Sequence, residues 1–195
     1  SKKKKVAKPT LLKKISEQQA VSRIVLKKPS MPLLGEVKVE NGKMYITDLE
    51  ISLEIKTGLE NGMYKLVGKE FIKTKSNPKD FPDVGKKISG EKIVDIETSL
   101  LFNEIKKANS FISKDSTSEV LTGIAVKFTE DGMRIMSTDS FRLYLKDVPA
   151  KISKQEDFII GNSKKLEKVL PIIGDKASVS INENSIEFSG SDGRI

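Results

Sequence analysis

The sequence of 195 residues contains no cysteine, no histidine and no tryptophan. Without cysteine, the chain forms no disulfide bond and has no thiolate for nucleophilic chemistry. Without histidine, it lacks the commonest general base and metal ligand of proteins. Most hydrolase and zinc mechanisms therefore lose their usual residues, and we expect neither a metal nor a cofactor.

Long apolar runs are also missing, and no stretch approaches the ~20 residues that a membrane-spanning helix needs. With 37% hydrophobic and 32% charged residues, the composition is typical of a soluble protein. The lysine run at positions 2–5 is not followed by the apolar segment of a secretory signal. We therefore expect a soluble, cytoplasmic protein without a membrane partner.

The net charge of +8 and the isoelectric point of 9.4 favour a polyanionic partner such as nucleic acid. The chain also carries 27 acidic residues, so its surface is mixed and charge alone supports nucleic-acid binding only modestly. The length allows either one large domain or two domains of about 100 residues each.

The segment 121–145 carries the clearest fold signal. Apolar residues alternate with small or polar ones from Ile124 to Phe128 and again from Met133 to Ile135. Asp131-Gly132 lies between these runs and is expected to supply the positive-φ pair of a tight hairpin. A second turn at residues 138–143 leads into another strand. The segment therefore predicts a β-meander.

The first half of the chain repeats this pattern over residues 35–55. Apolar residues alternate on both sides of Asn41-Gly42, a pair typical of type I′ hairpin turns. A Thr-Asp pair and a strand of alternating apolar residues follow. Thr138 lies 91 positions (138 − 47) after Thr47. Such regularity indicates an internal duplication.

Three helices are expected from apolar periodicity and helix-end signals. The first begins at Thr10 as N-cap, the second spans about 98–112, and the third spans 163–170 and is stopped by Pro171.

Residues 1–9 form a lysine-rich arm with almost nothing to bury, so we expect this arm to be flexible. Residues 76–82 are rich in proline, asparagine and serine and lack apolar periodicity, which indicates a linker. We place a domain boundary near Val84. The sequence thus predicts one unit over residues 10–84 and a second over 85–195.

The strand at 121–123, the hairpin and the turn at 138–143, in this order, resemble the middle domain of bacterial sliding clamps, the β subunits of DNA polymerase III. Segments 29–39 and 46–55 are similar to the family's first domain, and 80–84 to its first interdomain junction. The resemblance implies a shortened or divergent member with an α+β DNA-clamp fold, in which domains of antiparallel sheets with two helices each are repeated. The first copy is expected to be abbreviated, without its second helix and closing hairpin.

The resemblance also implies a pocket for the clamp-binding peptides of DNA polymerase and clamp-loader subunits. The family's motif positions fall on Leu121, Thr138, Ser140, Phe141, Arg142 and Leu143. An apolar cleft with one cation at its rim would suit an extended peptide. The purely structural alternative is that Thr138 and Asp139 cap a turn while Leu143 fills the core.

A DNA-facing surface is implied on the two helices of the second unit. Its residues lie opposite the apolar faces of these helices: Lys106, Lys107, Lys164, Lys165 and Lys168. Lys28 falls at a family position that is basic and touches duplex DNA. The alternative is that such lysines only keep the surface solvated.

The leading hypothesis is a non-enzymatic processivity factor that tethers polymerase or other partners to duplex DNA, as a homo-oligomer when full length. The alternative is a clamp-fold adaptor that forms no ring and recruits replication partners through the same pocket. A third hypothesis is a nucleic-acid hydrolase using Asp48 and Asp139 as paired carboxylates. Because both aspartates follow threonine in equivalent turns, we expect them to satisfy backbone donors instead.

Overall fold

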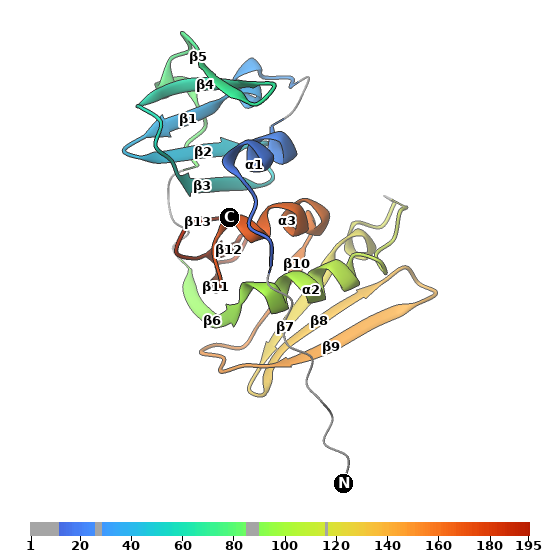
Figure 1. Ribbon diagram of the computed structural model, residues 1–195. Helices are drawn as coiled ribbons and strands as arrows, with labels where there is room; N and C mark the ends of the chain where they lie inside the picture. The colour runs from blue at the N-terminus through green and yellow to red at the C-terminus, as the bar shows by residue number, and fades with distance from the viewer. Residues whose placement is uncertain (1–11, 26–28, 85–89, 116) are drawn as a thin grey trace.

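The computed structural model describes residues 12–25, 29–84, 90–115 and 117–195 (Figure 1). The predictions for the basic arm and for Lys28 lie outside the described residues. Within the described ranges, no helix is both long and apolar enough to cross a membrane.

The described residues contain three α-helices: α1 (Glu17–Ile24), α2 (Thr98–Ala108) and α3 (Ser163–Val169). Four short 3-10 helices accompany them: η1 (Pro32–Gly35), η2 (Pro78–Asp80), η3 (Glu119–Thr122) and η4 (Leu170–Ile172).

A nine-stranded antiparallel sheet runs through both predicted units, in the order β5-β4-β1-β2-β3-β13-β12-β11-β6. Its strands from the first half of the chain are β1 (Val37–Glu40), β2 (Lys43–Thr47), β3 (Ser52–Lys56), β4 (Gly62–Val67) and β5 (Glu70–Lys73). Those from the second half are β6 (Glu91–Glu97), β11 (Lys176–Ile181), β12 (Ile186–Ser189) and β13 (Gly193–Arg194).

The second sheet has four antiparallel strands in the order β10-β7-β8-β9. They are β7 (Ile124–Thr129), β8 (Gly132–Thr138), β9 (Leu143–Pro149) and β10 (Glu156–Ile160). Together, the two sheets confirm the predicted α+β class and the predicted β-meander. The boundary near Val84 stays a prediction.

Helix α1 begins later than the sequence predicted. Ser16 is its N-cap, because the Ser16 hydroxyl accepts from the N–H of Gln19 and the Gln19 side chain accepts from the N–H of Ser16. This reciprocal capping box satisfies two backbone donors that the helix leaves unpaired. The apolar residues between Thr10 and Ile15 suggested a helix, but those that are described, from Leu12 onward, precede it.

Helix α2 ends at Ala108, four residues before the predicted end. The N–H groups of Ser110 and Phe111 bond to the carbonyls three residues back, at 3.0 and 2.9 Å. This tighter bonding pattern ends the α-helix. The Asn109 amide bonds to the Ser163 carbonyl at 3.2 Å and to Glu167 at 2.7 Å. These bonds tie the end of α2 to α3.

The two predicted hairpins differ in detail. Asn41 (φ 54°) and Gly42 (φ 72°) both adopt the left-handed region, as a type I′ turn requires. In the second hairpin only Gly132 has positive φ, at 141°, and the prediction for Asp131 is wrong. Gly132 is required by crowding as well, since a Cβ there would lie 2.3 Å from the Val148 carbonyl oxygen of β9.

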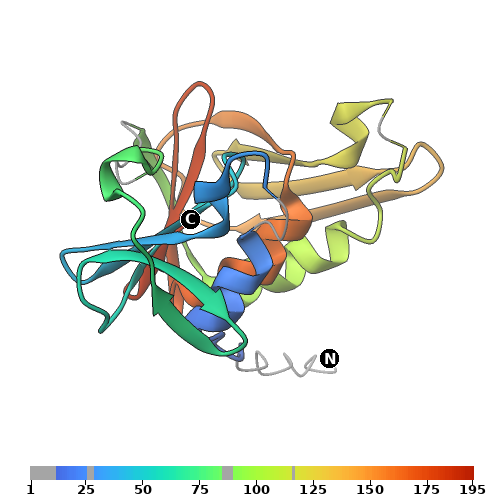
Figure 2. The same ribbon diagram turned by 90° about the horizontal axis from the view of Figure 1, so that it is seen from above.

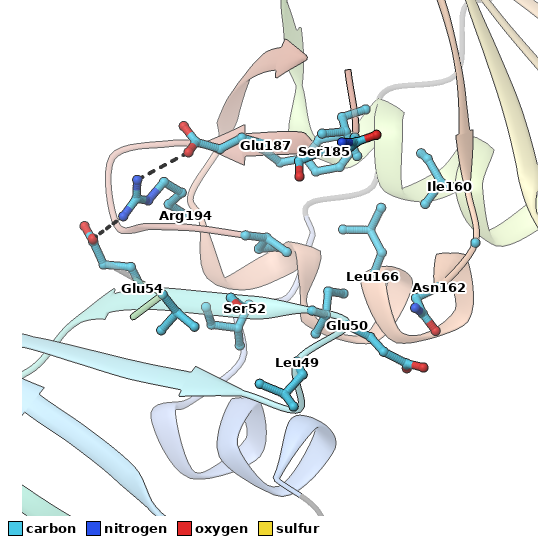
Figure 3. A pocket seen from close by; sticks show the side chains of 18 of the residues that line it. Leu49, Glu50, Ser52, Glu54, Ile160, Asn162, Leu166, Ser185, Glu187 and Arg194 are labelled. Carbon is cyan, nitrogen blue, oxygen red and sulfur yellow. Dashed lines mark hydrogen bonds and ion pairs between the residues drawn. The ribbon is translucent and has the colours of Figure 1, made fainter. Parts of the chain in front are cut away.

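The two halves of the large sheet join where β13 pairs with β3, with Arg194 opposite Glu54 and Gly193 opposite Ile55. Gly193 allows this approach, because a Cβ there would lie 2.7 Å from the Glu54 carbonyl oxygen. The Arg194 guanidinium lies between Glu54 and Glu187, and all three side chains are largely buried (Figure 3). The joint therefore combines backbone pairing with a buried ionic cluster.

The three α-helices form one layer. Helix α1 contacts β2 and β4, α2 contacts β6, β8 and β9, and α3 contacts both α1 and α2. Seen from above, the helices lie side by side in a row (Figure 2). Buried side chains such as Ala20, Ile24, Leu101, Ile105 and Leu166 fill the space between this layer and the sheets.

Lys165 of α3 also ties the two halves together. Its ammonium group contacts Asp48 Oδ2 and lies 2.7 Å from Glu50 Oε2, both in the turn between β2 and β3. Burial raises the pKa of Asp48, but the hydrogen bonds from Lys165 and from the N–H groups of Ile51 and Glu50 outweigh burial, and the pKa lies below its ordinary value. Lys165 is therefore held by two carboxylates, and its side chain is only half-buried, at 34% exposed.

We expect Lys165→Met to lower the free energy of unfolding by about 1–3 kcal/mol, since it leaves the buried Asp48 carboxylate without its ammonium partner. Lys164→Met, at the exposed neighbouring position, is the matched control and should change it by less than ~0.5 kcal/mol. Urea unfolding at neutral pH measures both. Equal effects of the two substitutions would contradict this role of Lys165.

Candidate functional site

The turn at residues 138–143 connects β8 to β9 and is held by its own side chains. The Thr138 hydroxyl donates to the Arg142 carbonyl at 2.8 Å and accepts from the Ser140 N–H at 3.1 Å. Asp139 Oδ1 accepts from the N–H groups of Phe141 and Arg142 at 3.1 and 2.9 Å. Ser140 has φ 75°. The backbone is therefore fixed without support from the core.

The turn between β2 and β3 has the same arrangement. The Thr47 hydroxyl donates to the Ile51 carbonyl and accepts from the Leu49 N–H. Asp48 Oδ1 accepts from the N–H groups of Glu50 and Ile51. Leu49 has φ 75°, the same value as Ser140 in the second turn. This agreement supports the predicted duplication. It also confirms that the aspartate in each turn serves backbone donors.

The side chains of the second turn point outward. Phe141 is 95% exposed and Leu143 63% exposed. The alternative in which Leu143 fills the core is therefore wrong. An aromatic ring and an aliphatic side chain are thus exposed on a turn whose backbone is fixed. Together they form an apolar surface that is available to a partner.

Arg142 is held in place from several sides. Its Nε and Nη2 donate to Asp139 Oδ2 at 3.1 and 2.8 Å, and its guanidinium carbon lies 5.2 Å from the centre of the Phe111 ring. Nη2 also lies 3.4 Å from the Ser110 carbonyl. The Arg142 hydrogen bond lowers the pKa of Asp139 to about 2. The cation at the turn is thus preorganised by contacts with the loop after α2.

A buried polar group lies beneath this loop. Phe111 packs against Tyr144, with ring centres 5.6 Å apart, and the Tyr144 hydroxyl donates to Glu104 Oε2. Glu104 is only 3% exposed, and Lys107 donates to its other oxygen at 2.8 Å. Burial raises the pKa of Glu104, but the bonds from Lys107 and Tyr144 outweigh burial and bring the pKa below its ordinary value.

Burial and the bond to Glu104 raise the pKa of Tyr144, so its hydroxyl stays protonated and donates. This contact is not predictable from the sequence, because Glu104 and Tyr144 lie 40 positions apart. The available signal was Tyr144 itself, because a tyrosine hydroxyl that is buried needs a hydrogen-bond partner.

Leu121 lies in η3, outside the turn. Its carbonyl accepts from the Ser113 N–H at 2.7 Å, which ties η3 to the loop after α2. The same loop contacts Arg142 through Ser110 and Phe111. The structure therefore gathers the other five predicted pocket residues in one turn and connects Leu121 to that turn through the intervening loop.

The predicted basic residues divide into two groups. Lys106, Lys107, Lys164 and Lys168 are exposed on the layer of helices. Lys165 is bound to the first turn, as described above. On α1, the Arg23 guanidinium donates to the Lys168 carbonyl, which brings a further cation next to α3.

The family model for the central domain of the DNA polymerase III beta subunit matches residues 95–195, more than half of the chain. The chain belongs to this family. The match covers β8, β9, the turn between them, and helix α3. It starts within β6, so the first unit lies outside it.

Solved structures of sliding clamps share the fold over most of the chain. The DNA polymerase III beta subunit of Thermotoga maritima has 17% sequence identity and a TM-score of 0.74 over 91% of this chain and 59% of its own length. A putative beta subunit from Eubacterium rectale has 15% identity and a TM-score of 0.75, over 91% of this chain and 60% of its own. A Pseudomonas aeruginosa sliding clamp bound to griselimycin has 16% identity and a TM-score of 0.70, over 91% and 59%.

These structures confirm the predicted DNA-clamp fold, including the first unit that the family model does not cover. The chain spans 59–60% of the lengths of these three clamps. No curated protein matches the chain. The central-domain match thus shows the family of the chain, and the solved structures show its fold.

The depressed pKa of Asp139 predicts a specific response to acid. The stabilisation from its ionised form is present above ~pH 4, the ordinary aspartate pKa, and is lost as the pH falls through about 2. Asp139→Asn removes this charge, so the variant should lose less stability than the unchanged chain over that interval. Urea unfolding at a series of acidic pH values measures it. Asp131→Asn, in an exposed turn, controls for the loss of one negative charge, and identical pH profiles for all three proteins would contradict the prediction.

Proposed function

We propose that this chain acts as a non-enzymatic, DNA-tethering clamp that holds a polymerase or other replication partners on duplex DNA. The observation that carries the proposal is the layer of three helices with exposed lysines on α2 and α3. A protein that slides along DNA needs many weak contacts to phosphates and no contacts that select a sequence. Lysine suits this need, since its charge sits on a long flexible side chain.

The DNA-facing surface that we propose consists of Lys106, Lys107, Lys164 and Lys168. Lys106 and Lys107 keep their side chains in place partly through neighbours on α2, as the Lys106 nitrogen lies 6.0 Å from the centre of the Phe102 ring and Lys107 pairs with Glu104. We leave Lys165 out, because it contacts two carboxylates and its side chain is 34% exposed, whereas Lys107 pairs with one carboxylate and is 58% exposed. The remaining lysines lie on neighbouring helices of one layer.

The turn at 138–143 supports partner recruitment through residues other than these lysines. Phe141 and Leu143 offer apolar contact, and Arg142 offers a fixed cation whose Nη1 has no hydrogen-bond partner among the described residues. An extended peptide with apolar side chains and one carboxylate would fit these groups. We propose that clamp-binding peptides of DNA polymerase and clamp-loader subunits bind here, with Leu121 at the edge of the site.

An adaptor that recruits partners through this turn without enclosing DNA is the second candidate. The nearly complete exposure of Phe141 favours the adaptor as much as it favours the clamp, because the turn is accessible without any ring. Homo-oligomerisation is part of the first proposal only.

Changing Lys106, Lys107, Lys164 and Lys168 together to alanine should weaken duplex binding to the same extent for unrelated sequences. Each lost phosphate contact should reduce the slope of log K against log salt by about 0.9. Fluorescence anisotropy of labelled duplexes over a range of salt concentrations measures this slope. Lys176, exposed on β11 and outside the helix layer, provides a control substitution to alanine. An unchanged slope in the fourfold variant would contradict the assignment.

Phe141→Ala combined with Arg142→Ala should weaken binding of a polymerase clamp-binding peptide by about 2 kcal/mol or more, because aromatic and arginine side chains dominate binding surfaces. Affinity for DNA should not change. Calorimetric titration measures the peptide affinity, and griselimycin, the ligand in the P. aeruginosa structure, is a second probe. Val67→Ala, exposed on β4, serves as the control. Full retention of peptide binding by the double variant would remove the turn from the proposal.

Retention on circular DNA separates the two candidates. A closed ring stays on circular duplex DNA and is lost when the DNA is linearised, whereas an adaptor dissociates equally from both forms. Gel filtration of the protein loaded on labelled DNA, before and after cutting at one site, measures this difference. Equal dissociation from the two forms would favour the adaptor.

A further inference from the structure

A series of contacts runs from the buried carboxylate of Glu104, on α2, to the guanidinium of Arg142 in the turn at 138–143. Tyr144 and Phe111 lie between these two groups. We propose that Tyr144 and Phe111 are positioning residues, which hold Arg142 in the orientation that receives a carboxylate of a bound partner. This inference rests on the partner site proposed above, and it assigns part of that site's selectivity for an acidic group to side chains behind the turn.

Glu104 provides a fixed end for this series. Its carboxylate is only 3% exposed, and it accepts hydrogen bonds from the Lys107 ammonium group at 2.8 Å and from the Tyr144 hydroxyl. A carboxylate so shielded from water needs such donors, because an unpaired buried charge is strongly unfavourable. Leu101 and Ile105, its neighbours on α2, are buried in the core. The Tyr144 hydroxyl is therefore bound to a group that cannot turn toward solvent.

The backbone that carries Phe111 is attached to the same sheet as Tyr144. The Ala108 carbonyl accepts from the Phe111 N–H at 2.9 Å and from the Ser137 hydroxyl at 2.7 Å. Ser137 is buried on β8 and lies directly opposite Tyr144 of β9. The rings of Phe111 and Tyr144 pack with their centres 5.6 Å apart, a favourable distance for an aromatic pair. The hydroxyl held by Glu104 therefore also limits the position of the Phe111 ring.

Arg142 is restrained in two directions, and each restraint comes from a different place. Asp139 accepts from its Nε and Nη2 at 3.1 and 2.8 Å, which fixes the guanidinium within its plane. The Phe111 ring covers one face, with its centre 5.2 Å from the guanidinium carbon. The Arg142 side chain is 60% exposed, and an ion pair at such a surface is a weak restraint by itself. Phe111 thus supplies the restraint that the turn's own side chains lack.

This orientation leaves one side of the guanidinium for a partner. Asp139 occupies the edge formed by Nε and Nη2, and Nη1 makes no hydrogen bond with any residue that the structure describes. A carboxylate forms a charge-assisted hydrogen bond with such a donor, which is stronger than the bond that a neutral amide forms. An arginine that is already ordered loses little further freedom when this bond forms. Loss of positioning should therefore reduce affinity for an acidic partner more than for a neutral one.

The probe is a pair of capped synthetic peptides, acetyl-Asp-Thr-Leu-Thr-Leu-amide and the same peptide with asparagine in place of aspartate. In an extended chain the first, third and fifth side chains lie on one side, so the acidic group accompanies both leucines. Tyr144→Phe keeps the ring and removes only the hydroxyl that binds Glu104. It should weaken binding of the acidic peptide about fivefold and leave binding of the neutral peptide nearly unchanged. Calorimetric titration of the full chain measures both affinities.

Tyr64→Phe is the matched control, because Tyr64 is also buried and its hydroxyl donates to the Glu60 carbonyl at 2.9 Å in the other unit. It removes a comparable hydrogen bond and should leave the affinity for both peptides unchanged. Phe111→Leu, at a half-buried position, should repeat the selective effect of Tyr144→Phe, whereas Phe71→Leu, at a half-buried position of β5, should not. Equal weakening of both peptides by Tyr144→Phe, or no weakening of the acidic one, would overturn the positioning role.

A second measurement needs no peptide. The chain has four arginines, so the Nε–H signal of Arg142 can be identified in NMR spectra of nitrogen-labelled protein by its loss in Arg142→Ala. Tyr144→Phe and Phe111→Leu should move this signal toward the position of an unrestrained arginine, and Tyr64→Phe should not. If the unchanged chain binds neither peptide, the partner site proposed above fails. An Nε–H signal that stays in place in both variants would overturn the positioning role by itself.

Discussion

The pairing of β13 with β3 is the constraint on which the rest of the structure depends. It turns strands from distant parts of the chain into one sheet, and it thereby fixes which faces of the two units lie on the same side. Because α1 packs on the first unit and α2 and α3 pack on the second, the common layer of helices follows from this pairing. A glycine at position 193 and the charges around Arg194 make the approach of the two strands possible.

The two duplicated turns share one backbone conformation but make different contacts with the rest of the fold. In both, threonine and aspartate fix the chain by the same hydrogen bonds. The residue three positions after the aspartate differs, Ile51 in the first turn and Arg142 in the second. Asp139 therefore binds the arginine of its own turn, which presents a cation at the surface. Asp48 has no such neighbour and binds Lys165 of α3 instead, which makes the first turn part of the joint between units.

The elements whose controlling interactions are local are predictable from the sequence. The Asn41-Gly42 turn, the alternation along β1 to β3 and β7 to β8, and the helix stopped by Pro171 were all predicted, since each depends on neighbours a few residues away. The exposed position of Phe141 also depends on local interactions, because its turn is closed by its own side chains. The start of α1 differs from the prediction, because the capping box at Ser16 begins the helix and the apolar residues further upstream do not.

Interactions between distant residues were not predictable in this way. Lys165 looked like any other lysine on a solvated helix face, and its partner Asp48 lies 117 positions earlier. The contact between Tyr144 and Glu104 likewise depends on how α2 sits on the second sheet. Periodicity identifies which face of a helix is buried, but it does not reveal which polar residue will meet a charge across the fold.

The two ionic ties at the joint lie at different places, one within the sheet around Arg194 and the other between α3 and the first turn. A connection fastened at two separated points resists both bending and twisting, whereas one fastened at a single point leaves a hinge. The layer of helices is therefore held against both kinds of movement relative to the large sheet. A ligand of the proposed DNA-facing surface would therefore meet helices whose backbone order is already present before contact, so that binding costs little further backbone entropy.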